Sequence, residues 1–159
     1  MRVFPIRVPL VGRLLIVSRP VGGDRLSDEL VALRREGVST LVSLLEPQEA
    51  AELQLVAEKE LCRENGIDFL CSPMPDRGLP PDPNAFRVLA RNLAARLHRG
   101  EVIAVHCRAG IGRSGLAAAA ILVSAGVERA DAIPLINDAR GVGVPDTDEQ
   151  RAWIAAFEP

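Results

Sequence analysis

The sequence predicts an α/β fold: a single three-layer domain over residues 1–159, with a mostly parallel central sheet flanked by helices. Three observations predict it. Short apolar, β-branched runs alternate along the chain with longer segments of helical periodicity. Glycine and proline separate these segments, and no repeat or flexible linker interrupts them. With 159 residues, 48% of them hydrophobic, the chain is long enough to bury one substantial core. Alternating strands and helices are typical of a parallel sheet covered on both faces.

The four runs predicted as buried strands are residues 14–17, 38–45, 67–72 and 102–105. Between and after them, the segments predicted as helices are residues 26–36, 47–65, 84–98, 114–125, 128–139 and 147–157. In the first helix, Leu26, Leu30 and Leu33 recur at helical spacing. Pro47 favours a helix start at its position, and Pro134 predicts a kink or restart.

Composition excludes several classes of protein. The net charge of -2 lacks the basic excess of a nucleic-acid binder. No uncharged apolar run approaches the roughly 18 residues of a membrane span, and arginines interrupt the apolar N-terminal segment, so no signal peptide is expected. Three cysteines are too few for a disulfide framework, which favours a reducing, cytoplasmic location.

The most informative segment is residues 106–115, HCRAGIGRSG, between a predicted strand and a predicted helix. Gly110 and Gly112 let such a loop curl so that its amides point inward at an anion, next to the positive helix end. Arg113 supplies a planar two-pronged donor for phosphate oxygens. The positive potential of the loop amides, the helix end and Arg113 also favours the thiolate form of Cys107. This makes the cysteine a nucleophile that can attack phosphorus. The predicted phosphate-binding residues are Arg108, Ala109, Gly110, Ile111, Gly112 and Arg113.

A second cysteine also lies six positions before an arginine, because Cys71 precedes Arg77 at the same spacing. That segment has no glycine between the two residues, and Pro73 and Pro75 remove amide donors that an anion nest needs. It also leads into a proline-rich loop rather than a helix. The match at Cys107 is therefore the one that predicts a site.

The run of His106, Cys107, Arg113 and Ser114 resembles the His-Cys-x5-Arg-Ser/Thr signature of the cysteine-based protein tyrosine phosphatases. The short length is most similar to their small dual-specificity branch, and the resemblance extends over about residues 12–157. It implies two-step hydrolysis through a phosphocysteine, without metal or other cofactor. It also implies phosphotyrosine, and further phosphoserine and phosphothreonine, as substrates in proteins.

Such a reaction needs a proton donor for the leaving group and then a base for water. Asp76 is the candidate, since it lies in a loop after a strand, 31 residues before Cys107, and family members place an aspartate at about that distance. The alternative is an aspartate that stabilises a turn beside Gly78. Asp82, between two prolines, is the reserve candidate and otherwise a helix-entry residue.

Other residues are given supporting roles. By analogy with the family, Ser114 is expected to hydrogen-bond the cysteine sulfur, or else to cap the helix. His106 is expected to support the loop from behind, with its side chain pointing away from the pocket that Cys107 faces. Glu46 either pairs with a loop arginine or favours the next helix start. Arg140 and Gln150 are candidates for approaching the pocket, with surface roles as the alternative.

Three other functions remain open at this level. The same chemistry can act on a phosphoinositide, nucleotide or sugar phosphate. A phospho-binding module without activity would need a broken site, and a rhodanese-like loop would lack the aspartate loop. Cys62 and Cys71 are predicted to be core thiols. The predicted partner is a phosphorylated protein or small phosphoester substrate, and no oligomeric state is assigned.

Overall fold

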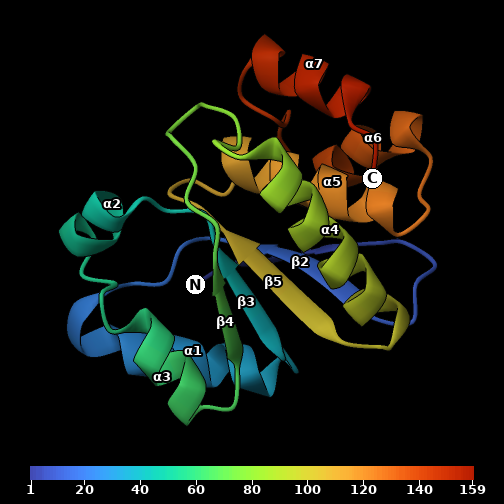
Figure 1. The fold of residues 1–159 in the computed structure, drawn as a ribbon. Helices are drawn as coiled ribbons and strands as arrows, with labels where there is room; N and C mark the ends of the chain where they lie inside the picture. Colours follow the sequence, from blue (N-terminus) through green and yellow to red (C-terminus); the bar gives the residue numbers. More distant parts are fainter.

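One five-stranded sheet organises the molecule in the computed structural model, which describes residues 1–159 (Figure 1). The strands, in the spatial order β1-β2-β5-β3-β4, are β1 (Val3–Ile6), β2 (Arg13–Val17), β5 (Val102–His106), β3 (Thr40–Ser43) and β4 (Asp68–Cys71). The last four run parallel, and β1 pairs antiparallel with β2 at the edge. The mostly parallel sheet is thus confirmed. The strand β1 was not predicted, because it is short and contains Pro5, which an edge position tolerates.

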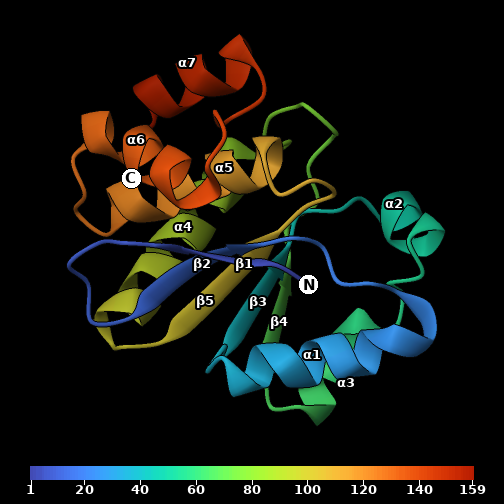
Figure 2. The same ribbon diagram turned by 180° about the vertical axis from the view of Figure 1, so that it is seen from behind.

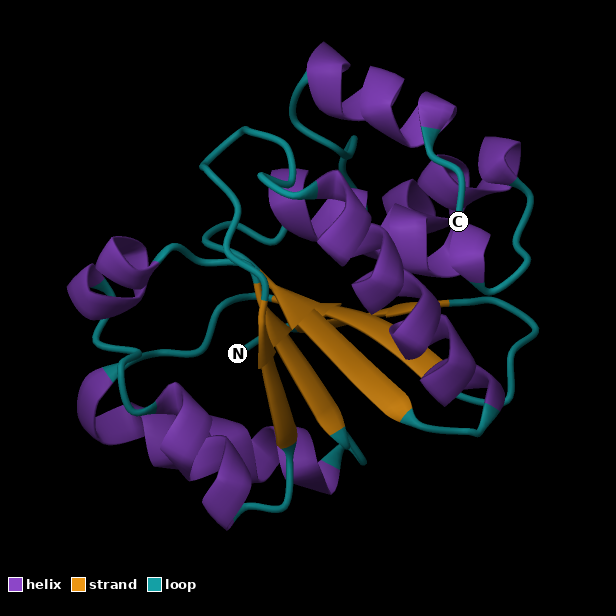
Figure 3. Ribbon diagram, viewed as in Figure 1, coloured by secondary structure: helices purple, strands orange, loops and turns teal.

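Helices cover both faces of this sheet, giving three layers (Figures 2 and 3). The helices are α1 (Leu26–Arg35), α2 (Pro47–Glu52), α3 (Glu58–Glu64), α4 (Pro83–His98), α5 (Gly112–Ser124), α6 (Arg129–Arg140) and α7 (Asp148–Ala156). Helices α1 and α3 lie on one face, and α4 and α5 lie on the other, with α6 and α7 packed against α5. None of the helices combines the length and the apolar composition needed to cross a bilayer.

The two faces of the sheet bury separate cores. The larger one, under α4 to α7, includes Ile103, Val105 and Cys107. The smaller one, under α1 and α3, includes Ala104 and Cys62. Because successive residues of a strand point to opposite faces, β5 feeds both cores in alternation, and this alternation continues to its carboxyl end.

The predicted helix over residues 47–65 is wrong in one respect: it is broken into α2 and α3. Gln54 takes a left-handed backbone conformation (φ 57°), which ends the first helix. A tertiary contact holds the break, since Gly23 N–H donates to the Gln54 carbonyl (3.1 Å). A side chain at Gly22 would lie 2.0 Å from the Leu53 carbonyl oxygen, so this close approach requires glycine. Helix α6, in contrast, continues through Pro134.

Asp82 is the N-cap of α4: its side chain accepts hydrogen bonds from the N–H groups of Asn84 and Ala85, both at 3.0 Å. Its helix-entry role is confirmed, and that role explains its place before Pro83.

Replacing this cap gives the first prediction. Asp82→Ala should lower the free energy of unfolding by about 1 kcal/mol, because two amide donors of α4 lose their acceptor. Asp82→Asn should stay near wild type, since an asparagine oxygen can also accept. Urea denaturation of the three proteins checks this, and equal losses in both variants would contradict the capping role.

Candidate active site

The loop after β5 begins with Cys107 and ends where α5 starts at Gly112. The Cys107 thiol is buried and accepts a hydrogen bond from Gly110 N–H at 3.2 Å. Gly110 has φ +69°, and a side chain at Gly112 would lie 2.7 Å from an Asp146 oxygen. Gly110 is therefore needed for its backbone angle, whereas a side chain at Gly112 would require the Asp146 carboxylate to move. The loop curls around the sulfur as the sequence predicts.

Helix α5 is almost entirely buried beneath this loop, including its small-residue run of alanines 117–120. The free N–H groups of its first turn lie at the loop, and such groups attract an anion. Ser114 lies in this first turn, fully buried, and its hydroxyl forms no hydrogen bond with protein groups. The bond to the Cys107 sulfur that the resemblance implied is not present, and the cap position is Ile111 rather than Ser114.

The Arg113 side chain is buried, with 1% of its surface exposed. It follows β5 and contacts the segments that follow two neighbouring parallel strands. Its guanidinium donates to both carboxylate oxygens of Glu49 (2.6 and 2.9 Å). It also donates to the carbonyls of Met74 (2.9 Å) and Leu44 (3.4 Å), which follow β4 and β3. Burial alone would lower the pKa of Arg113, but the Glu49 hydrogen bonds and the nearby Cys107 and Asp76 raise it, so the charge is retained.

Asp76 lies at the mouth of the loop. Its carboxylate is 3.1 Å from the Arg113 guanidinium and its side chain remains 64% exposed, so it is open to a ligand. A turn closed by the Gly78 N–H to Pro75 carbonyl bond (2.9 Å) holds it there. Helix α7 supports this turn because the Gln150 amide donates to the Gly78 carbonyl (2.9 Å). The structure thus brings Asp76 next to Arg113, while Asp82 remains a helix cap.

Glu49 is the site residue that sequence reasoning missed. The sequence predicts a role only for Glu46 in this segment, and the structure shows that Glu46 and Glu49 form a capping box at the start of α2. Glu46 accordingly caps the helix and pairs with no arginine. Only the tertiary structure turns Glu49 towards Arg113, and this contact lowers the pKa of the Glu49 carboxyl below its ordinary value of 4.5.

Arg108 differs from expectation. Its side chain is half exposed and lies 3.6 Å from Glu52 and 3.9 Å from Glu49, both on α2. It therefore extends along the acidic side of α2, and its charge is partly compensated before any phosphate arrives. Neighbouring Ala109 is exposed.

Arg140 and Gln150 both reach the site. Arg140 donates to the Gly110 carbonyl (2.7 Å) and lies over the ring of Phe4, 3.7 Å from its centroid. Gln150 is fully buried, and its amide oxygen has no hydrogen-bond partner. That oxygen lies near Gly112, 3.2 Å from the position a side chain would take there. The two residues thus brace the loop from the side of α6 and α7.

The cysteines differ from the expectation of two core thiols. Cys62 is buried in α3, as predicted, and burial raises the pKa of its thiol to about 12. Cys71 is exposed at the end of β4, so the prediction for it is wrong. It is the last residue of β4, the strand at the edge of the sheet.

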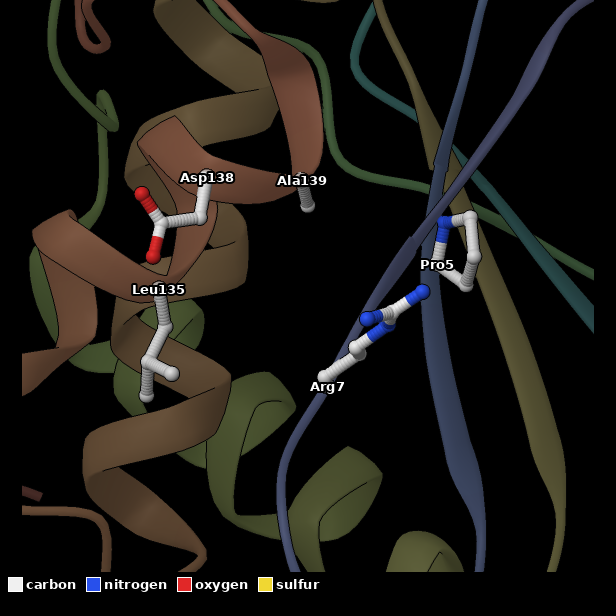
Figure 4. Close-up of a pocket in the computed structure, with 5 residues that line it drawn as sticks. All are labelled: Pro5, Arg7, Leu135, Asp138 and Ala139. Atoms are coloured by element: carbon white, nitrogen blue, oxygen red, sulfur yellow. The ribbon is translucent and has the colours of Figure 1, made fainter.

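A separate surface pocket lies between the N-terminal strand and α6 (Figure 4). Pro5 and Arg7 line one side, and Leu135, Asp138 and Ala139 line the other. The Arg7 guanidinium lies on the Pro5 side of the pocket, and the Asp138 carboxylate points away from Arg7 (Figure 4). No polar groups converge there, and none of the loop residues 107–113 takes part. No cluster of three or more His, Cys, Asp or Glu side chains is arranged to hold a metal ion.

The structure thus brings together a buried thiol in a curled loop, a buried arginine and an exposed aspartate, as the sequence predicts for a cysteine-dependent phosphatase. The family described as polymorphic toxin system, DSP-PTPase phosphatase matches residues 17–127, well over half of the chain. The chain belongs to this family of tyrosine and dual-specificity phosphatases.

Individual relatives agree. Protein tyrosine phosphatase type IVA 3 of Mus musculus is 27% identical over 149 residues, covering 92% of this chain and 79% of the relative. Cyclin-dependent kinase inhibitor 3 of Rattus norvegicus is 27% identical over 127 residues, covering 79% of this chain and 59% of the relative. Among solved structures, kinase associated phosphatase, with its catalytic cysteine replaced by serine, is similar with a TM-score of 0.83. It is 21% identical, with 99% of this chain and 97% of that chain covered.

The Glu49–Arg113 pair gives a prediction of pH dependence. Because the pKa of Glu49 is lowered in the folded protein, its pairing stabilises the fold fully above pH 4.5 and loses this effect as the pH falls further. Glu49→Gln should therefore be less stable than wild type at pH 7, with a gap that shrinks below pH 4.5.

Urea denaturation at several pH values measures this gap. Glu64→Gln, at an exposed glutamate at the end of α3, serves as the control and should show no such gap. A gap that stays constant or widens in acid would refute the pairing.

Proposed function

We propose that this protein is a phosphotyrosine and dual-specificity protein phosphatase in which Cys107 is the nucleophile, Arg113 binds the phosphoryl group and Asp76 is the acid and then the base. One observation carries the proposal: a buried arginine beside the thiol loop, held by Glu49 and facing a solvent-open carboxylate. The family membership supports the chemistry, and the contacts on the page support the choice of residues.

Binding begins at the loop. The N–H groups of residues 108–113 and the positive end of α5 attract the phosphoryl dianion. Glu49 holds the Nη1 and Nη2 groups of Arg113, and this positions the guanidinium to donate to phosphoryl oxygens as well. Binding energy placed here also stabilises the charge that spreads over the equatorial oxygens in the transition state.

In the first step, the Cys107 sulfur attacks phosphorus and the bond from phosphorus to the ester oxygen breaks. Asp76, in its protonated form, gives its proton to the leaving oxygen, which departs as the free hydroxyl of tyrosine, serine or threonine. The exposure of Asp76 supports this role, because the leaving group must reach solvent. Ser114, buried in the first turn of α5, is proposed to donate to the sulfur when it carries or releases the phosphoryl group.

In the second step, a water molecule attacks phosphorus and the sulfur–phosphorus bond breaks, which releases inorganic phosphate and the Cys107 thiolate. The Asp76 carboxylate takes the proton from the water. Gln150 is proposed to position the Asp76 turn for this step, since its amide nitrogen donates to the Gly78 carbonyl.

The charges around the loop favour a substrate with one phosphate in a protein. Arg108, the only additional cation within the loop, lies against Glu49 and Glu52, so a second phosphate on that side would compete with two carboxylates. We propose that Arg108 contributes its backbone N–H. Phosphoinositides, nucleotides and sugar phosphates remain the alternative substrates.

We also propose that residues 1–159 form one catalytic domain, since all elements from β1 to α7 pack around a single sheet. The unpaired cysteines support a reducing, cytoplasmic location, where the nucleophilic thiol persists.

Hydrolysis of p-nitrophenyl phosphate in EDTA tests the mechanism. Cys107→Ser should abolish turnover, because a serine hydroxyl is not ionised at this site. Asp76→Asn should lower kcat by about a hundredfold, the usual contribution of a positioned general acid. Asp82→Asn, at the capping aspartate of the same loop, is the matched control and should turn over like wild type.

Two results would redirect the proposal. Full turnover by Cys107→Ser would exclude the cysteine mechanism. An inert wild type that still binds vanadate would indicate a phospho-binding module.

A substrate panel tests the substrate class. Because acidic residues of α2 surround Arg108, kcat/KM should be higher for a singly phosphorylated tyrosine peptide than for a phosphoinositide carrying several phosphates. Release of inorganic phosphate from both substrates at equal ionic strength measures the ratio, and a preference for the phosphoinositide would reverse the assignment.

A further inference from the structure

A buried pair of ionisable residues lies directly behind the nucleophile. Glu58, at the start of α3, is 2% exposed, and His106, the last residue of β5, is fully buried. The Glu58 Oε1 and His106 Nε2 atoms are 3.1 Å apart. The two atoms are close neighbours without hydrogen-bond geometry, because neither ring nitrogen of His106 nor Glu58 Oε1 forms a hydrogen bond with protein groups. The imidazole thus lies buried against the Glu58 carboxyl group.

This pair lies on the opposite side of the sheet from the reaction. Cys107 belongs to the core under α4 and α5, whereas Cys62, beside Glu58 on α3, belongs to the core under α1 and α3. The electrostatic effect of Glu58 adds to burial in raising the pKa of the Cys62 thiol, as expected for a nearby carboxylate. His106 therefore points away from the phosphate loop, as predicted, and cannot touch the substrate.

His106 lies where the chain leaves β5 and enters the phosphate loop. Its carbonyl accepts a hydrogen bond from Leu44 N–H (3.0 Å), and its side chain contacts Glu58. The next residue is Cys107. The His106 backbone is hydrogen-bonded and its side chain is buried against Glu58, so the next peptide, which carries the sulfur, has a defined orientation. In-line attack on phosphorus requires such an orientation.

The break between α2 and α3 makes this contact available. Glu49 and Glu58 come from a segment that would be one straight helix if it were continuous, with the two residues about 13 Å apart along its axis. The break at Gln54 lets Glu49 turn to Arg113 and Glu58 turn beneath the sheet to His106. The two glutamates therefore support opposite ends of the same loop.

We propose that Glu58 is a positioning residue for catalysis: through His106 it holds the Cys107 end of the phosphate loop in the orientation for attack, as Glu49 holds the Arg113 end. The inference rests on the proposed role of Cys107 as nucleophile. A buried imidazole whose neighbouring carboxyl group is replaced can change rotamer, because little else on the polar side of the ring restrains it. The cost falls on the reaction step rather than on phosphate binding, which Arg113 and the loop amides provide.

Steady-state kinetics of Glu58→Gln with p-nitrophenyl phosphate tests this inference. We expect kcat to fall about tenfold or more, as small misplacements of a reacting group do, with KM within about twofold of wild type. Each assay is run at a temperature where circular dichroism shows the variant fully folded. Glu58→Asp, which keeps the charge but shortens the reach, provides a second variant and should fall in the same direction.

Glu29→Gln is the matched control. Glu29 is also a nearly buried carboxylate in an ion pair, with the N-terminal amine at 2.9 Å, and it lies on α1, away from the loop. This variant should lose stability and keep kcat. Cys107→Ser, measured in parallel, separates a failure of the proposed function from a failure of this inference. Turnover retained in Cys107→Ser would overturn the proposed function. An unchanged kcat in Glu58→Gln would overturn only the role of Glu58.

A double-mutant cycle decides whether Glu58 acts through His106. His106→Asn alone should lower kcat to an extent similar to that seen in Glu58→Gln. The kcat of the double variant should be no lower than that of the less active single variant, because both changes remove the same interaction. Losses that multiply would mean that the two residues act independently, and so would overturn the inference, as would equal loss of kcat in Glu29→Gln.

Discussion

The buried charge of Arg113 is the constraint on which the rest of the site depends. A guanidinium that is 1% exposed is tolerated only when its N–H groups are paired. Its partners come from two connections: Leu44 and Glu49 from the one after β3, and Met74 from the one after β4. Satisfying this one cation therefore fixes the carboxyl ends of three parallel strands relative to one another. The same requirement brings Cys107, Arg113 and Asp76 together at one edge of the sheet.

The parallel sheet supplies the second constraint, because alternate residues at the end of β5 face different cores. Cys107 faces the side of α5, whose N-terminus attracts the phosphoryl group, and His106 faces the side of α3, where Glu58 lies. Chemistry and support are thereby divided between the two faces of one strand. A loop held from both faces can remain in one conformation before the substrate arrives, which reduces the reorganisation that reaction would otherwise require.

The immediate surroundings of the loop are electrically uneven. On the side of α2, Glu49 and Glu52 lie near Arg108. On the side of α6, Arg140 is stacked over Phe4 and bonded to the loop at Gly110. The aspartate turn, supported by Gln150 of α7, closes the remaining side. Since exposed ion pairs contribute little stability, the uneven charge matters chiefly for which substrates approach and in which orientation.

The sequence by itself determined the alternation of strands and helices, the curled loop at Cys107 and the candidate aspartate, because periodicity, glycine placement and residue spacing are local properties. The rejection of the Cys71 match was likewise a local matter of missing amide donors. Only the tertiary structure decided that the predicted helix over residues 47–65 breaks at Gln54 and that Glu49 rather than Glu46 contacts Arg113. It also decided that the Arg108 side chain lies against α2 and that His106 contacts Glu58. The physical reason is that a buried charge selects its partner by proximity in space, and residues from different connections become neighbours only when the sheet has formed.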